Sequence, residues 1–341
     1  MRPASRNLPA ALLSCIAIAI AMAGACARRS TLPDALGDRE FWSLIESLSE
    51  PAGEFTLSDN LVSNEPRFAE IAKWLRPVGG GYIGVGPEQN FSYIAGLRPE
   101  IAFIVDIRRE NLDLHLLYKA LFELSTDRVD FVSLLFSRAR PADLTPAASA
   151  DEIFERYDRI AASPELFDAN AARVRERLLE TRNFPVPQAD LETIDLTLRV
   201  FYTAGPAIDY YGSRAATAVR PSYRQLMTSK DFTGAAQSFL ASEERFQFVK
   251  ALQTRNLIVP VVGNFAGPGA MRRAGDYVRQ HRNVITAVYG SNVGVYLNSL
   301  EAPIYCVNLA SLPATTATWF IESDRLRLLR DKLKSCQPEK N

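Results

Sequence analysis

The sequence predicts an α/β fold, in which a largely parallel sheet is flanked by helices and interrupted by a helical insertion. Short apolar runs typical of buried strands alternate with helical patterns over residues 82–124. The same alternation returns over residues 256–308. Between them, residues 138–229 have a helical pattern broken by prolines and no convincing buried strand. We therefore expect the first and last thirds of the chain to share one sheet.

The first third begins with two predicted helices, over residues 40–48 and 65–75, where apolar residues recur at helical spacing. Strands are predicted at 82–85 and 101–105, and helices at 89–97 and 108–124. The order strand, helix, strand, helix is typical of parallel strands joined by crossover helices.

The last third carries the remaining predicted elements. Strands are predicted at 256–262, 284–289 and 304–308. Helices are predicted at 268–280 and 322–333, and a further helix begins at about Asn292. The chain is predicted to begin with an export signal over residues 1–25. The α/β domain is then predicted over residues 36–137 and 231–335, with the helical insertion over residues 138–230 between its two parts.

The composition excludes several classes of protein. Of 341 residues, 47% are hydrophobic, which is enough for a substantial core. The 39 basic residues balance the 39 acidic ones, so no overall field favours nucleic acid as a partner. His115 and His281 have no partner at ligand spacing, and no Cys-x-x-Cys pair occurs, so no metal site is expected. The sequence leaves the oligomeric state open.

The N-terminal segment has the features of an export signal. Arg2 and Arg6 precede an almost uncharged run over 8–25, which closes in small residues. Cys26 follows directly, so the segment also resembles a bacterial lipoprotein signal. These features predict a periplasmic protein or a lipoprotein attached to the membrane at Cys26. The alternative is an uncleaved anchor that leaves the protein facing the cytoplasm.

If residues 1–25 are removed on export, the cysteines that remain besides Cys26 are Cys306 and Cys336, and two states are possible for this pair. In an oxidising compartment they would form one disulfide. Otherwise they would be two buried thiols.

The turn after the first strand carries the first candidate binding residues. Gly84 and Gly86 permit a tight turn and close approach of a ligand, and Glu88, Gln89 and Asn90 offer hydrogen bonds to it. The N–H groups at the start of the following helix would add to such a site. A glycine-lined structural turn would explain the same pattern.

Asp106 ends the second predicted strand, where an acidic side chain can accept hydrogen bonds from ribose hydroxyls. Its alternative role is to cap the helix that begins near Arg108. After the strand at 256–262, Asn264 and Phe265 are candidate substrate residues, although a turn that caps the next helix also explains them.

Two neighbouring aromatic residues of the insertion, Tyr210 and Tyr211, are further candidate substrate residues. They could line the mouth of a substrate site. Alternatively, they pack the insertion against the α/β domain, as aromatic side chains often do. No catalytic residue is predicted.

Four segments, over residues 82–90, 105–111, 256–268 and 291–293, together resemble an uncharacterised bacterial family. That family has a Rossmann-like fold of the class I S-adenosylmethionine-dependent methyltransferase type. The resemblance covers most of the chain after residue 40. It implies S-adenosylmethionine as a cofactor, with Gly84 and Gly86 beside its methionine part and the ribose on Asp106.

The resemblance does not identify a methyl acceptor, and a second hypothesis stands beside it. The protein is then a non-catalytic or repurposed exported domain that binds another small molecule or a protein partner. Because S-adenosylmethionine is made and held in the cytoplasm, the predicted export favours this second hypothesis.

Overall fold

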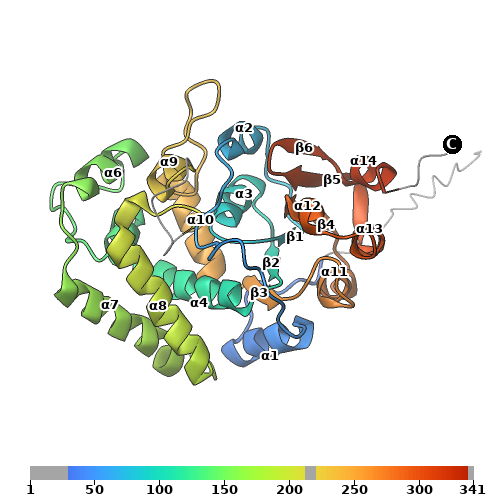
Figure 1. The fold of residues 1–341 in the computed structure, drawn as a ribbon, viewed down its shortest axis with the longest axis horizontal. Helices are drawn as coiled ribbons and strands as arrows, with labels where there is room; N and C mark the ends of the chain where they lie inside the picture. The colour runs from blue at the N-terminus through green and yellow to red at the C-terminus, as the bar shows by residue number, and fades with distance from the viewer. Residues whose placement is uncertain (1–29, 212–219, 337–341) are drawn as a thin grey trace, which may run out of the picture.

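The computed structural model describes residues 30–211 and 220–336 (Figure 1). The predicted export signal and Cys26 lie outside these residues. The buried hydrophobic core of the described chain extends from Leu36 to Leu329. A chain that begins at Ser30 therefore retains this whole core.

The described residues form a six-stranded sheet in the order β3-β2-β1-β4-β5-β6. Neighbouring strands are parallel except β5 and β6, which are antiparallel. The strands are β1 (Gly81–Gly84), β2 (Ile101–Asp106), β3 (Ile258–Val262), β4 (Ile285–Ser291), β5 (Ala314–Glu322) and β6 (Arg325–Leu328). The chain builds outward from β1 to β3 and then continues on the other side of β1. The order therefore reverses between β1 and β4, and the predicted α/β fold with a mostly parallel sheet is confirmed.

The apolar runs of the sequence explain the central strands. Every residue of β1, β2 and β3 is buried, as expected for parallel strands that are covered on both faces. Pro260 lies within β3 and has no N–H group to donate to a neighbouring strand. It is tolerated because β3 is at the edge of the sheet.

Helices cover both faces of the sheet. Figure 1 shows α3, α4 and α10 on one side of the strands and α1, α11 and α13 on the other. The first group is α3 (Gln89–Leu97), α4 (Arg109–Leu124) and α10 (Glu243–Thr254), and the second is α1 (Asp38–Leu48), α11 (Ala270–Gln280) and α13 (Glu301–Ser311). Three shorter helices are α2 (Phe68–Ala72), α12 (Val293–Tyr296) and α14 (Leu329–Lys334).

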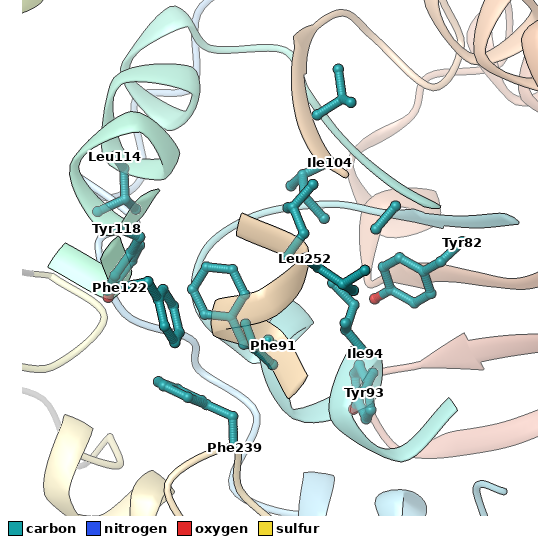
Figure 2. Packing of buried hydrophobic residues seen from close by; sticks show 14 of the residues in the cluster. Tyr82, Phe91, Tyr93, Ile94, Ile104, Leu114, Tyr118, Phe122, Phe239 and Leu252 are labelled. Atoms are coloured by element: carbon teal, nitrogen blue, oxygen red, sulfur yellow. The ribbon is translucent and has the colours of Figure 1, made fainter. Parts of the chain in front are cut away.

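Aromatic rings join α3 to α4. The ring of Phe91 on α3 lies 5.2 Å from the rings of Tyr118 and Phe122 on α4, and 5.4 Å from the ring of Phe239. All three contacts are edge-on, which is a favourable arrangement of ring quadrupoles. Figure 2 shows these side chains pointing toward one another, with Tyr82 of β1 and Tyr93 of α3 to their right.

The segment between α4 and α10 is largely helical. Its helices are α5 (Arg128–Phe136), α6 (Ala150–Asp158), α7 (Pro164–Glu176), α8 (Gln188–Ala204) and α9 (Tyr223–Met227). Ser149 and Ser163 cap α6 and α7, and Pro164 occupies the first position of α7, where its missing N–H is harmless. Because α8 packs on α4 and α5, this segment is attached to the helical layer rather than to the sheet.

Two predicted elements of the last third are wrong. Residues 304–308 belong to α13 instead of a strand, because Asn298 and Glu301 cap a helix there in spite of the following β-branched residues. Residues 322–333 are the end of β5, all of β6 and most of α14, not one helix. The buried apolar run at the end of β5 pairs with β4 and continues the sheet.

Cys306 of α13 and Cys336, which follows α14, form a disulfide with their Cα atoms 5.8 Å apart. This decides between the two alternatives left by the sequence. The disulfide ties α14 to α13 beside the edge of the sheet. Among the described helices, we find none that combines the length and the hydrophobicity needed to cross a bilayer.

Candidate functional site

A cavity of about 350 Å³ lies at the carboxyl ends of β1, β2, β3 and β4. Parallel sheets bind ligands at this edge, where the strand order reverses. The volume lies within the range of about 300–1,000 Å³ that is common for small-molecule sites. The segments that follow the four strands form its wall, together with the loop between α1 and α2, Tyr210, and residues of α12 and α13.

Half of the ten predicted site residues line this cavity. They are Gly86, Asp106, Tyr210, Asn264 and Phe265. The other five lie outside its wall: Gly84, Glu88, Gln89, Asn90 and Tyr211. The strand ends were therefore better guides to the cavity than the polar residues at the start of α3.

Asn90 organises the turn between β1 and α3. Its Nδ2 donates to the carbonyl oxygens of residues 85–87 at 2.8–3.1 Å, and its Oδ1 accepts from the hydroxyl of Tyr82 at 2.9 Å. Gly86 has a φ of +75°, which favours glycine, and its carbonyl lies 2.9 Å from Nε2 of His115. The hydrogen-bonding groups of Asn90 are thus engaged within the turn, which explains why this predicted ligand residue does not face the cavity.

Glu88 and Gln89 are completely buried beneath the turn. Both carboxylate oxygens of Glu88 accept from the backbone N–H of Ser63 at 3.2 Å, which holds the α1–α2 loop against α3. Burial raises the pKa of Glu88 to about 8. The side-chain amide of Gln89 has no hydrogen-bond partner among the described residues. Glu88 therefore holds Ser63, a residue of the cavity wall, in place without lining the cavity itself.

The raised pKa of Glu88 predicts a pH-dependent stability. The unfolded chain ionises this group near its ordinary value of 4.5, whereas the folded chain does so only at about 8. The contribution of Glu88 is therefore fully present below pH 4.5 and is lost as pH rises toward 8. Between these limits, we expect the stability of a Glu88→Gln variant to gain about 2–4 kcal/mol relative to the wild type.

Urea unfolding at a series of pH values measures this gain. The glutamine substitution also changes the free energy of unfolding by an amount that does not depend on pH. That amount does not affect the test, because only the pH dependence of the difference between variant and wild type is compared. A Glu155→Gln variant, at an exposed position of α6, serves as the control and should show no such trend. Parallel pH profiles for Glu88→Gln and the wild type would contradict the prediction.

Asp106 and Arg108 form a buried ion pair on the cavity wall. Asp106 Oδ1 accepts from the backbone N–H of Arg108 at 3.0 Å and lies 3.2 Å from its Nε. The two residues are 4% and 6% exposed. Arg108, not Asp106, occupies the N-cap position of α4. Asp106 thus supports the start of α4 from two residues upstream while its carboxylate remains at the cavity.

Asn264 and Phe265 belong to a turn that is held from both sides. Asn264 Oδ1 accepts from the N–H of Ala266 at 2.8 Å, and Asn308 Nδ2 donates to the carbonyl of Phe265 at 2.7 Å. The carboxylate of Glu50 accepts from backbone N–H groups at the start of α11. The capping turn expected as the alternative is present, but Glu50, which lies far away in the sequence, supplies the cap.

Ser291 and Glu65 also belong to this region, although neither is among the predicted site residues. Ser291 ends β4 with a φ of +44° and lines the cavity, and its hydroxyl donates to Glu65. Ser323 donates to the same Glu65 oxygen at 2.9 Å. Glu65 is 2% exposed, and burial raises its pKa. The sequence placed Glu65 at the start of a predicted helix over residues 65–75, whereas it precedes α2 and its partners lie at the end of β4 and just after β5.

Tyr210 brings the insertion to the cavity. It is 7% exposed, and its carbonyl accepts from the hydroxyl of Ser58 in the α1–α2 loop. The ring of Tyr211 lies 5.5 Å from that of Tyr210 but outside the cavity wall. Among the residues that the structure describes, no group of three or more His, Cys, Asp or Glu side chains could hold a metal ion.

The fold and the cavity define an α/β protein with a small-molecule-sized site at the carboxyl edge of its sheet. The chain belongs to the family described as domain of unknown function (DUF7790), whose model matches residues 60–329. The match spans every strand of the described sheet and the segments that follow the four strands around the cavity. A search of curated proteins finds no match to the chain.

Proposed function

We propose that the cavity binds S-adenosylmethionine and that the protein is a methyltransferase-like enzyme with a Rossmann-like fold of the class I type. The observation that carries this proposal is the position of Asp106 on the cavity wall, at the carboxyl end of β2 and beside the turn of Gly86. An acidic side chain at that position can accept both hydroxyls of a ribose. The reversal of strand order between β1 and β4 supports the same reading.

The residues of the wall fit the parts of this cofactor. Asp106 offers an acceptor for ribose hydroxyls, and the guanidinium of Arg108, 6% exposed, offers a donor for a carboxylate. Phe265 and Ile107 supply apolar surface for an adenine ring. A ribose on Asp106 would share the carboxylate with Arg108, whose Nε lies 3.2 Å from Oδ1 and holds the carboxylate in its orientation.

S-adenosylmethionine supplies an activated methyl group. The chain contributes binding, alignment and exclusion of water, which are the main sources of rate for such a transfer. The amide of Asn264 can orient an acceptor but cannot take its proton. The proposal therefore assigns positioning roles and no general base.

The disulfide favours a second candidate function. Cys306 and Cys336 are bonded, and disulfides persist in oxidising compartments, which agrees with the predicted export. There the same cavity would bind another small molecule, because S-adenosylmethionine is a cytoplasmic metabolite. The binding measurement below separates the two candidates.

Isothermal calorimetry with S-adenosylmethionine and S-adenosylhomocysteine tests the proposal on a chain that begins at Ser30. We expect micromolar binding, and an Asp106→Asn variant that binds about 10–100-fold more weakly, because a charge-assisted hydrogen bond is worth about 1.5–3 kcal/mol. An Asp276→Asn variant is the control, since Asp276 pairs with Arg279 on the surface of α11. The absence of binding at millimolar ligand would overturn the proposal and favour the second candidate.

A further inference from the structure

The described residues expose ten large apolar side chains, and half of them belong to one segment. We call these five residues the α12–α13 patch: Val295, Tyr296, Leu300, Ile304 and Val307, which are 79%, 45%, 79%, 43% and 59% exposed. Exposed apolar residues that are scattered singly need no explanation, but a concentration of this kind marks an interaction surface.

The patch carries no charge of its own. Between Ser291 and Ile321 the sequence contains a single charged residue, Glu301. Its carboxylate accepts from the backbone N–H of Asn298 at 3.0 Å, so it is engaged in the cap of α13. A helix that faced water would carry charged residues on its outer face. The outer face of α13 carries Ile304 and Val307 instead.

A basic segment lies beside the patch. Residues 322–336, which include β6 and α14, contain five basic and three acidic residues, a net charge of +2. Three of the basic residues pair within the segment, Arg327 and Lys332 with Glu322 and Lys334 with Asp331, and the other two, Arg325 and Arg330, are exposed. The Cys306–Cys336 disulfide and the packing of α14 on α13 hold this segment against the helix of the patch. Figure 1 shows α13 and α14 at one end of the molecule, with α12 further in, toward β4. An apolar face with a basic border fits a membrane that carries anionic lipids.

We propose that the α12–α13 patch docks the protein on an anionic lipid surface. Val295 and Leu300, each 79% exposed, project from the surface, and projecting side chains enter a fluid lipid layer without a preformed partner pocket. The segment offers a protein partner a single charged side chain, Glu301, to fix its orientation, and that carboxylate is already engaged in the cap of α13. Because Tyr296 also lines the cavity, docking would place the cavity rim at the membrane whatever the cavity binds.

Vesicle sedimentation of a chain that begins at Ser30 tests this docking without the N-terminal segment. The probes are phosphatidylcholine vesicles with and without phosphatidylglycerol. We expect binding that requires phosphatidylglycerol, and a Val295→Ser/Leu300→Ser variant that binds roughly tenfold more weakly or worse. A Leu196→Ser/Phe232→Ser variant is the matched control, since these side chains are 63% and 67% exposed elsewhere.

Three results would overturn the proposal. The first is no binding to anionic vesicles, and the second is equal binding by the patch variant and the wild type. The third is a dimer in sedimentation velocity that the patch substitutions abolish, because the patch would then be covered by a second copy of the chain. Melting curves of both variants should match the wild type, as all four substituted side chains are largely exposed.

Discussion

Replacing Gly84 by alanine is expected to destabilise the fold by about 3 kcal/mol or more, near the upper end of what overpacking costs. A Cβ atom at Gly84 would lie 1.9 Å from Oδ1 of Asn90 and 2.7 Å from Cε1 of Tyr82. Neither neighbour can move freely, since Tyr82 is fully buried and Asn90 holds the carbonyls of residues 85–87. Relieving the overlap would break hydrogen bonds in the turn that forms part of the cavity wall.

Urea unfolding followed by circular dichroism measures this loss. Gly294→Ala is the control, because a Cβ at Gly294 would meet no atom within 4 Å. We expect the control to remain within about 1 kcal/mol of the wild type. Equal stabilities for the two alanine variants would contradict this role of Gly84. The glycine predicted from the sequence to pass a cofactor has a structural role in the strand, since it makes room for Asn90.

Replacing Lys119 by methionine is expected to cost about 3 kcal/mol, the lower end of what breaking a buried ion pair costs, because Glu123 keeps its pair with Arg182. The side chains of Lys119 and Glu123 are 2% and 3% exposed and lie 2.9 Å apart. Lys119 also donates to the carbonyl of Gln253 on α10. Its removal would leave Glu123 with Arg182, 2.8 Å away, and Arg177, 4.0 Å away, and would leave the Gln253 carbonyl without this donor.

A double-mutant cycle with Glu123→Gln checks this prediction. The double variant should lose less stability than the sum of the two single variants, since each single variant already removes the Lys119–Glu123 pair. Arg67→Ala is the control: Arg67 and Glu70 are 2.7 Å apart but 63% and 46% exposed, and such exposed pairs contribute little to stability. If Lys119→Met costs no more than Arg67→Ala, the buried pair does not stabilise α4 as described.

The sequence predicted the central sheet well because its strands are uninterrupted apolar runs. Such runs identify β1, β2, β3 and β4 without knowledge of their neighbours. It failed at residues 304–308, where β-branched residues face solvent on α13, and at 322–333, where strand pairing overrides a helical pattern. In both segments the structure depends on contacts that no local window contains.

The same distinction applies to the candidate site. Strand ends could be located from the sequence because parallel strands share one carboxyl edge, so Gly86 and Asp106 were found. The burial of Glu65 and the capping by Glu50 were not predictable, because their partners lie more than 200 residues away. Polar residues near the strand ends, such as Asn90, were assigned to a ligand although the turn itself needs them.

Hydrogen–deuterium exchange of the chain with and without S-adenosylhomocysteine tests the central claim most directly. We expect protection at the segments that follow β1, β2 and β3, over residues 85–87, 106–108 and 263–265, because these line the cavity. The outer helices α6 and α7 should show no change. Unchanged exchange at saturating ligand, or protection confined to other segments, would contradict the assignment of this cavity as an S-adenosylmethionine site.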